Sequence, residues 1–334
     1  METLRSDTEW FRVDSESAAG AVRRAAVRLA TRLGYTETRV AEVAIVASEA
    51  TSNIWRHAGA GAVALQVVVR GEDAGLRLSA IDRGPGMADL RRSAADGSST
   101  RGTLGVGIGA IDRLSSALDV SSHPGHGTVL VAELWPEQPP TGAFELAALT
   151  RPIDGEEECG DVVGARETDG HLVVLLADGL GHGPLAAVSA RGALAAFHDS
   201  ESTDPGELIT RMHRAIGHTR GAAVAVASVD PAGELAFAGV GNISAMIDDG
   251  ERRHAGLSQP GIVGHNVSRV RQHRLTLASG SLLVLHSDGM KENWNLRDVP
   301  GLGRRSAAAI AATLLRDAGT RPDDASVLVA RRLR

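Results

Sequence analysis

Two apolar segments of the sequence each end in an aspartate followed by a glycine. "HLVVLLADGLGHG" places Asp178 after one apolar run, and "LLVLHSDGM" places Asp288 after another. A carboxylate at the end of a buried strand costs several kcal/mol unless a charge or a hydrogen-bond donor meets it. A bound metal ion would supply that charge. A tight turn is the alternative explanation, because Asp-Gly is among the commonest turn dipeptides.

Further acidic residues at strand ends favour the metal interpretation. Asp161 lies in the glycine-flanked "CGDVVG", and Asp323 and Asp324 lie just before the apolar "ASVLV". Together, these carboxylates are the hard oxygen ligands that Mg²⁺ and Mn²⁺ prefer. Two such ions, bridged by Asp178 and a water, would lower the pKa of that water and hold a substrate phosphate. Gly179 would add a backbone carbonyl. The set predicts direct hydrolysis of a phosphomonoester.

The first third of the chain carries a second group of polar residues. Glu49, Asn53 and His57 follow one another at four-residue spacing in "SEATSNIWRHA", which places them on one face of a helix. In "LRLSAIDRGPGM" the alternation of a strand puts Asp82 on the apolar face, where its carboxylate needs a partner. Taken singly, the first pattern is more typical of an exposed polar helix face, and the second of an aspartate in a bulge or turn.

Two glycine-rich segments follow these patterns in the sequence. Gly84 and Gly86, directly after the strand aspartate, let the backbone turn sharply and admit a ligand. In "GTLGVGIGAI", Gly105, Gly107 and Gly109 run into a helix, whose free N–H groups can hold phosphates. The loop is not a Rossmann fingerprint, since no strand leads into it, and it lacks the Gly-Lys-Ser/Thr of a Walker A loop. The order of these motifs predicts a nucleotide pocket.

The elements that position these residues fall into two α/β regions. Segments of alternating apolar residues predict several strands in each region. The segment "PEQPPTGA" concentrates prolines and is the best candidate for a linker. We therefore expect domains over residues 1–135 and 147–334, joined by a linker over 136–146. Helices are expected over about residues 15–33, 38–57, 184–198, 205–217 and 304–317.

Length and composition limit the class of protein. A chain of 334 residues favours two domains, and 43% hydrophobic content with 3% aromatic residues predicts cores of Ala, Val, Leu and Ile. The net charge of −6 argues against a nucleic-acid partner. No apolar stretch approaches the roughly 18 residues of a membrane span, and the N-terminus lacks the apolar core of a signal peptide. We expect a cytoplasmic protein without nucleic-acid or membrane partners.

The motifs of the predicted nucleotide pocket resemble those of the Bergerat-fold (GHKL) ATPases. "SEATSNIWRHA" is similar to their N box, "DRGPGM" to the first glycine box and "GTLGVGIGAI" to the second. The resemblance implies ATP and Mg²⁺ as ligands. Asn53 would hold Mg²⁺, Asp82 would accept a hydrogen bond from the adenine amino group, and Thr128 would complete the adenine site. The loop around Gly105–Gly109 would cover the phosphates.

Among these ATPases, the short domain looks closest to the RsbT-type switch kinases, small serine kinases of bacterial sigma-factor switches. That resemblance makes Glu49 the candidate base for a serine hydroxyl, because a carboxylate near the phosphate end of ATP can accept the hydroxyl proton. The alternative is that Glu49 only orients a Mg²⁺-bound water.

The acidic motifs, in the order "GD … ADGLGHG … SDG … DDAS", resemble the SpoIIE-type metal-dependent serine/threonine phosphatases of the 2C group. The short domain with "DGLGHG" looks most like the RsbX-type phosphatases. The resemblance implies two Mn²⁺ or Mg²⁺ ions, with Asp178 as the bridging ligand. By the same resemblance, the second ion would be bound by Gly179 and, directly or through a water, by Asp161. The first ion would be bound by Asp288 and Asp323, and Asp324 would be a polar neighbour.

These resemblances imply a mixed α/β (α+β) protein. A Bergerat-type α/β sandwich would precede an α-β-β-α sandwich of the 2C phosphatase type. We expect a bifunctional regulator of a bacterial partner-switching pathway for sigma factors or stress. Its first domain would phosphorylate serine or threonine of a STAS-domain protein, and its second would remove phosphate from the same or a paralogous protein. The alternative is a nucleotide-gated anti-sigma or STAS-binding module without kinase activity, fused to an active phosphatase.

Overall fold

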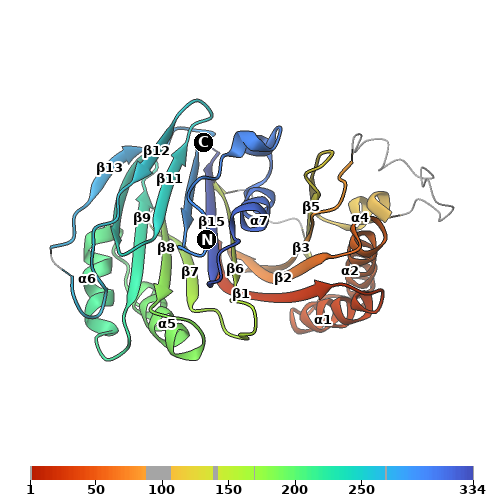
Figure 1. Cartoon of the computed structure of the whole chain (residues 1–334), viewed down its shortest axis with the longest axis horizontal. Helices are drawn as coiled ribbons and strands as arrows, with labels where there is room; N and C mark the ends of the chain where they lie inside the picture. Colours follow the sequence, from red (N-terminus) through yellow and green to blue (C-terminus); the bar gives the residue numbers. More distant parts are fainter. Residues whose placement is uncertain (1, 88–106, 138–141, 169, 268, 334) are drawn as a thin grey trace. The chain divides into compact units, whose positions relative to one another are not determined.

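The chain forms two compact units in a computed structural model that describes residues 2–87, 107–137, 142–168, 170–267 and 269–333 (Figure 1). The first unit comprises Asp7–Pro140 and Asn295–Arg316. The second unit comprises Met1–Ser6, Thr141–Trp294 and Asp317–Arg334. Among the helices in the described part of the chain, none is long and apolar enough to cross a membrane.

The first unit contains a sheet whose strands lie in the order β1-β2-β3-β5-β4. These strands are β1 (Glu2–Val13), β2 (Gly61–Arg70), β3 (Asp73–Asp82), β4 (Ala117–Ser122) and β5 (Thr128–Leu134). The pairs β2–β3, β3–β5 and β4–β5 are antiparallel. Alternate residues of the strands form one apolar core with helices α1 (Ala18–Arg32), α2 (Glu37–Ala58) and α4 (Gly107–Leu114). Figure 1 shows these helices gathered beside β2 and β3.

Capping interactions explain where α2 begins and ends. The Thr36 side chain accepts a hydrogen bond from the backbone N–H of Arg39, and Glu37 places a negative charge in the first turn. Gly59 ends the helix in the left-handed conformation at φ 75°, which glycine adopts without steric cost. The helix therefore stops two residues before β2 begins, and its polar face lies close to the end of the sheet.

The second unit contains two sheets. The strands of one sheet lie in the order β13-β10-β9-β8-β7, and those of the other in the order β12-β11-β14-β15-β6. The first group is β7 (Asp161–Thr168), β8 (His171–Gly179), β9 (Ala222–Val229), β10 (Glu234–Val240) and β13 (His273–Thr276). The second group is β6 (Phe144–Arg151), β11 (Ser244–Asp248), β12 (Arg253–Gly256), β14 (Leu282–His286) and β15 (Ala325–Arg332).

Two apolar cores hold the second unit together. One contains residues from both sheets, among them Leu176 and Leu328. The other lies between the sheet that contains β8 and helices α5 (Pro184–His198) and α6 (Pro205–Ala215). It contains Leu175 and Phe197. Successive residues of β8 thus enter opposite cores, which explains why this strand is a continuous apolar run instead of an alternating one.

The segment between β14 and β15 carries the last helical elements. It forms the short 3-10 helices η1 (Leu296–Asp298) and η2 (Leu302–Arg304), followed by α7 (Ala307–Ala318). Within the first unit, the Asp119 carboxylate of β4 accepts hydrogen bonds from Arg305 Nη1 at 3.2 Å and from the backbone N–H of Ser306 at 2.7 Å. Residues 295–316 therefore belong to the first unit by their contacts, although they follow most of the second unit in the sequence.

The mixed α/β class predicted from the sequence is confirmed, as are the predicted helices. Strand β1 was not predicted. Its sequence, "ETLRSDTEWFRV", alternates weakly and carries charged residues on both sides, so periodicity gave no strand signal.

Candidate functional site

The predicted nucleotide residues of α2 lie next to the end of β3. The β2–β3 register pairs Asp82 with Gly61, which follows α2 closely. Asn53 Nδ2 is buried and has no hydrogen-bond partner among the described residues. A Cβ at Gly107 would lie 3.1 Å from Asn53 Oδ1, so the Asn53 amide contacts the start of α4. Glu49 is half-buried one turn earlier on the same helix.

The Asp82 carboxylate is fixed by two backbone donors. Its Oδ1 atom accepts hydrogen bonds from the N–H of Gly84 at 2.8 Å and from the N–H of Thr128 at 3.0 Å. Burial raises the pKa of Asp82, while the two N–H donors and the charges of Arg316 and His57 oppose that rise. Both backbone bonds use Oδ1, so Oδ2 accepts no hydrogen bond from the described residues and can accept one from a ligand. Thr128 itself shares a hydrogen bond of 2.9 Å with the Ser122 hydroxyl.

Glycine is required at the positions after Asp82 because neighbouring segments lie too close for a side chain. Gly86 has φ 70°, and a Cβ there would lie 1.9 Å from the carbonyl oxygen of His123. A Cβ at Gly84 would lie 2.6 Å from the Cβ of Ala58 at the end of α2. Gly107 and Gly109 lie in the first turn of α4, where the N–H groups of a helix start can bind an anion. Gly105 lies outside the described residues.

In the second unit, strand register brings the predicted acidic residues to one end of the two sheets. Asp161 at the start of β7 pairs with Asp178 at the end of β8. In the other sheet, Asp288 follows β14 and Asp323 precedes β15, and these strands pair with His286 opposite Val327. Neighbouring strands therefore deliver four carboxylates that are separated by up to 162 residues in the sequence.

The electrostatics of this acidic site reflect burial and mutual repulsion. Burial, followed by the charges of Asp161, Asp288 and Asp323, raises the pKa of Asp178 strongly. Burial is also the main cause of the raised pKa of Asp161, where nearby Ser287 and Ser326 hydroxyls oppose the rise. Burial and the Asp323 charge raise the pKa of Asp288. Such carboxylates are stabilised in their ionised form by a cation.

Several observations test whether divalent cations fit this site. Asp161 is only 2% exposed, and neither of its carboxylate oxygens has a well-aligned hydrogen-bond donor in the described part of the chain. At Gly179 a Cβ would lie 2.0 Å from the carbonyl oxygen of Ala186, so only glycine fits there. The described carboxylates do not by themselves converge into a three-ligand cluster. The all-oxygen donor set and the unsatisfied Asp161 oxygens fit Mg²⁺ or Mn²⁺.

Two further residues, Asn242 and Asp324, make side-chain hydrogen bonds beside the acidic site. Asn242, just after β10, donates from Nδ2 to Asp288 Oδ2 at 2.5 Å. Asp324 accepts hydrogen bonds of 2.7 Å from the backbone N–H groups of Ile153 and Gly160, so its carboxylate is used to fix the loop before β7. Sequence reasoning missed Asn242, since a lone asparagine after a strand carries no spacing signal.

The remaining polar residues near the site have local partners. His182 shares a 3.0 Å hydrogen bond between its Nδ1 and Glu156 Oε1, at an exposed position. Burial and the charges of Asp161 and Asp324 raise the pKa of the Cys159 thiol, which disfavours the reactive thiolate form.

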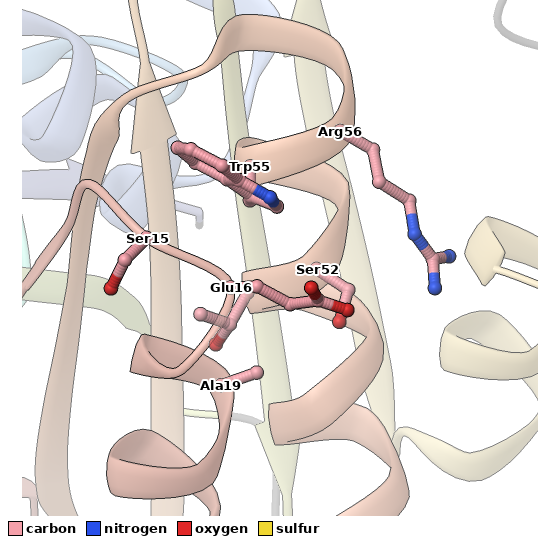
Figure 2. Close-up of a pocket in the computed structure, with 7 residues that line it drawn as sticks. Ser15, Glu16, Ala19, Ser52, Trp55 and Arg56 are labelled. Atoms are coloured by element: carbon pink, nitrogen blue, oxygen red, sulfur yellow. The ribbon is translucent and has the colours of Figure 1, made fainter.

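A small cavity of about 130 Å³ lies apart from both groups of residues (Figure 2). It opens between the start of α1 and a face of α2 that does not carry Glu49, Asn53 or His57. Figure 2 shows Trp55 of α2 on the side of Ser15 and Glu16 at the start of α1, whereas the Arg56 side chain points away from Ser15. None of the residues predicted for nucleotide or metal binding lines it.

Family models match each part of the chain. Residues 11–133 match the histidine kinase-like ATPase domain, and residues 168–333 match the family of stage II sporulation protein E, SpoIIE. The serine/threonine-protein kinase RsbT of Bacillus subtilis (strain 168) is 32% identical over 130 residues, which are 39% of this chain and 98% of that protein. The phosphoserine phosphatase RsbX of the same organism is 26% identical over 140 residues, covering 41% of this chain and 70% of RsbX.

Two solved structures agree with these matches. A chain from work on the bacterial stressosome is 32% identical with a TM-score of 0.54, covering 57% of this chain and 100% of its own length. A crystal structure of RsbX in complex with magnesium shares the fold, with a TM-score of 0.51 and 20% identity over 64% of this chain and 98% of RsbX. The chain belongs to the RsbT family of histidine kinase-like ATPases, and its RsbT-like domain is fused to a phosphatase domain of the SpoIIE and RsbX type.

Proposed function

We propose that this protein is a bifunctional regulator of a bacterial partner-switching pathway. Along the sequence, we assign residues 1–135 to its ATP-binding, kinase-like domain, residues 136–146 to the linker and residues 147–334 to its phosphatase domain, although residues 295–316 are part of the first compact unit and residues 1–6 of the second. The substrate of both domains is a STAS-domain protein or a pair of paralogues, a proposal supported by the likeness to RsbT and to a stressosome-related chain. A sigma-factor regulator is the expected downstream partner.

The proposed kinase reaction uses the residues around Asp82. The free Oδ2 of Asp82 would accept from the adenine amino group, and Asn53 would hold the Mg²⁺ that accompanies the ATP phosphates. The first turn of α4 would donate N–H groups to those phosphates. Glu49, one turn from Asn53 on α2, would take the proton of a serine or threonine hydroxyl as its oxygen attacks the γ-phosphorus and ADP leaves.

The proposed phosphatase reaction is hydrolysis of a phosphoserine or phosphothreonine. Two divalent cations would supply a nucleophilic water at neutral pH and hold the phosphate oxygens. Asp178 would bridge them, Asp161 and the Gly179 carbonyl would bind the second, and Asp288 and Asp323 the first. A P–O bond forms to the water, the P–O bond to the side chain breaks, and the side-chain oxygen takes up a proton. The observation that supports this proposal is that register pairs Asp161 with Asp178, and that the charges of Asp288 and Asp323 from the other sheet act on Asp178.

Labelled ATP and a neighbouring STAS protein test both reactions. In an Asp178→Asn background, which traps product, we expect label to accumulate on serine or threonine of the STAS protein. Adding wild-type protein with Mn²⁺ should then remove the label. Absence of label despite intact ATP binding would reduce the first domain to a nucleotide-gated binding module. Retention of label with wild-type protein and Mn²⁺ would contradict the proposed phosphatase.

A further inference from the structure

Arg220 lies beside the loop that follows the proposed bridging ligand. Strand β9 pairs with β8 so that Ala222 is opposite Gly179 and Ala223 is opposite Asp178. Just beyond this pairing, the backbone N–H of Leu180 donates to the carbonyl oxygen of Gly221 at 3.1 Å. The residue that precedes Gly221 is therefore held at the rim of the acidic site by backbone hydrogen bonds.

The Arg220 side chain reaches back over this loop. Its Nη1 atom lies 3.3 Å from the position that a Cβ would occupy at Gly181, so the guanidinium rests where a larger residue would place its side chain. Arg220 is exposed, and its guanidinium forms no hydrogen bond or ion pair within the described residues. By contrast, nearby Arg191 pairs with Glu158, and Arg321 donates to the carbonyl oxygen of Asp288 at 2.7 Å.

A free guanidinium at this place has a clear chemical use. It carries a permanent charge and five donors in a planar fork, which matches two oxygens of a phosphate. A phosphate dianion entering the site also approaches several carboxylates, whose repulsion an added positive charge offsets. Gly181 has φ 89° and presents no side chain, so Arg220 Nη1 can pack close against the loop that follows Asp178.

We propose that Arg220 binds the phosphoryl oxygens of the phosphoserine or phosphothreonine substrate that are not held by the metal ions. This inference rests on the proposed phosphatase function and adds to it a substrate-binding residue from outside the acidic motifs. Arg220 is two residues before β9 and shares no motif with the acidic residues, which is why the sequence alone did not single it out.

Steady-state kinetics with the full-length protein and Mn²⁺ test this role. The variants are Arg220→Ala, Arg220→Lys and Arg211→Gln, and the substrates are p-nitrophenyl phosphate and a phosphoserine peptide. Arg211 is a matched charge control, because it donates to the carbonyl oxygen of Asp199 at the far end of α5, roughly 20 Å from the loop. Calorimetry with Mn²⁺ alone measures metal affinity in each variant.

We expect Arg220→Ala to raise KM and the inhibition constant of inorganic phosphate by about tenfold, because the variant loses a charge-assisted hydrogen bond to the phosphate. Arg220→Lys should show a smaller rise, because lysine keeps the charge and loses the fork. Mn²⁺ affinity should be unchanged in both, and Arg211→Gln should behave as wild type. If Arg220→Ala is active with unchanged KM and unchanged inhibition by phosphate, the role of Arg220 is overturned and the phosphatase function stands. The role is also overturned if Mn²⁺ affinity falls by the same factor as KM rises. No hydrolysis by the wild-type and Arg211→Gln proteins would overturn the phosphatase function and this inference with it.

Discussion

At the scale of single residues, Asp178 provides a test that needs no substrate. Burial and its neighbouring carboxylates raise the pKa of Asp178 to about 9, whereas an aspartate in an unfolded chain titrates near pH 4. Between these values the folded, metal-free protein keeps a proton that the unfolded chain has lost, so the free energy of unfolding decreases as pH rises. We expect the Tm of the metal-free protein to fall from about pH 5 to about pH 8.

The variant Asp178→Asn separates this carboxylate from other titrating groups. Asparagine carries no proton to lose, so the dependence of Tm on pH should be weaker in this variant, and its metal-free form should be more stable than wild type at pH 8. Saturating Mn²⁺ should stabilise the wild-type protein increasingly as pH rises, because the ion binds the ionised carboxylates. Equal pH slopes in the two metal-free proteins would contradict the proposed electrostatics.

Asn242 is expected to act by positioning Asp288. Its amide donates to Asp288 Oδ2 at 2.5 Å, and hydrogen bonds that orient a metal-binding carboxylate typically contribute about 10- to 100-fold to metal affinity. We expect Asn242→Ala to weaken Mn²⁺ binding in calorimetry by at least about tenfold. Asn242→Asp should weaken it as well, since the donor is replaced by an acceptor. Mn²⁺ affinity that is unchanged in both variants would show that the Asn242 contact does not support the metal.

At the scale of elements, the turn after β3 depends on backbone geometry. Gly86 combines φ 70° with a Cβ position only 1.9 Å from the carbonyl oxygen of His123, whereas Gly59 has φ 75° with open space around it. Gly59→Ala should therefore cost about 1 kcal/mol, from backbone strain alone. Gly86→Ala should cost about 3 kcal/mol or more and also weaken ATP binding, because the backbone must move. Denaturant unfolding and calorimetry with ATP–Mg²⁺ measure the two effects, and equal costs for the two variants would argue against the close approach.

At the scale of the whole molecule, we expect each proposed activity to depend on its own residues. Asn53→Ala should abolish ATP–Mg²⁺ binding and leave Mn²⁺-dependent hydrolysis of p-nitrophenyl phosphate intact. Asp178→Asn should reduce hydrolysis by at least about a thousandfold, in the range seen when a principal catalytic group is removed, and leave ATP binding unchanged. Calorimetry and steady-state hydrolysis on the same preparations provide the comparison. Loss of both functions from either change would contradict separate sites.

Most secondary structure could be predicted from the sequence because local patterns determine it. The periodicity of α1 and α2, the proline at the start of α5 and α6, and the apolar run of β8 each act over a few residues. Strand β1 escaped prediction because its pairing partners, distant in sequence, stabilise a segment with little alternation of its own. Residues 295–316 likewise join the first unit through contacts such as Asp119 with Arg305, which no local pattern indicates.

The sequence by itself determined the types and order of the chemical groups: the aspartates at strand ends, the helix face with Asn53 and the glycine turns after Asp82. Tertiary structure decided how these groups meet. Register set Asp161 opposite Asp178, Asn242 reached Asp288, and Arg220 came to lie over Gly181. The physical reason is that residue type and local spacing are written along the chain, whereas strand pairing and side-chain contacts depend on partners tens of residues away.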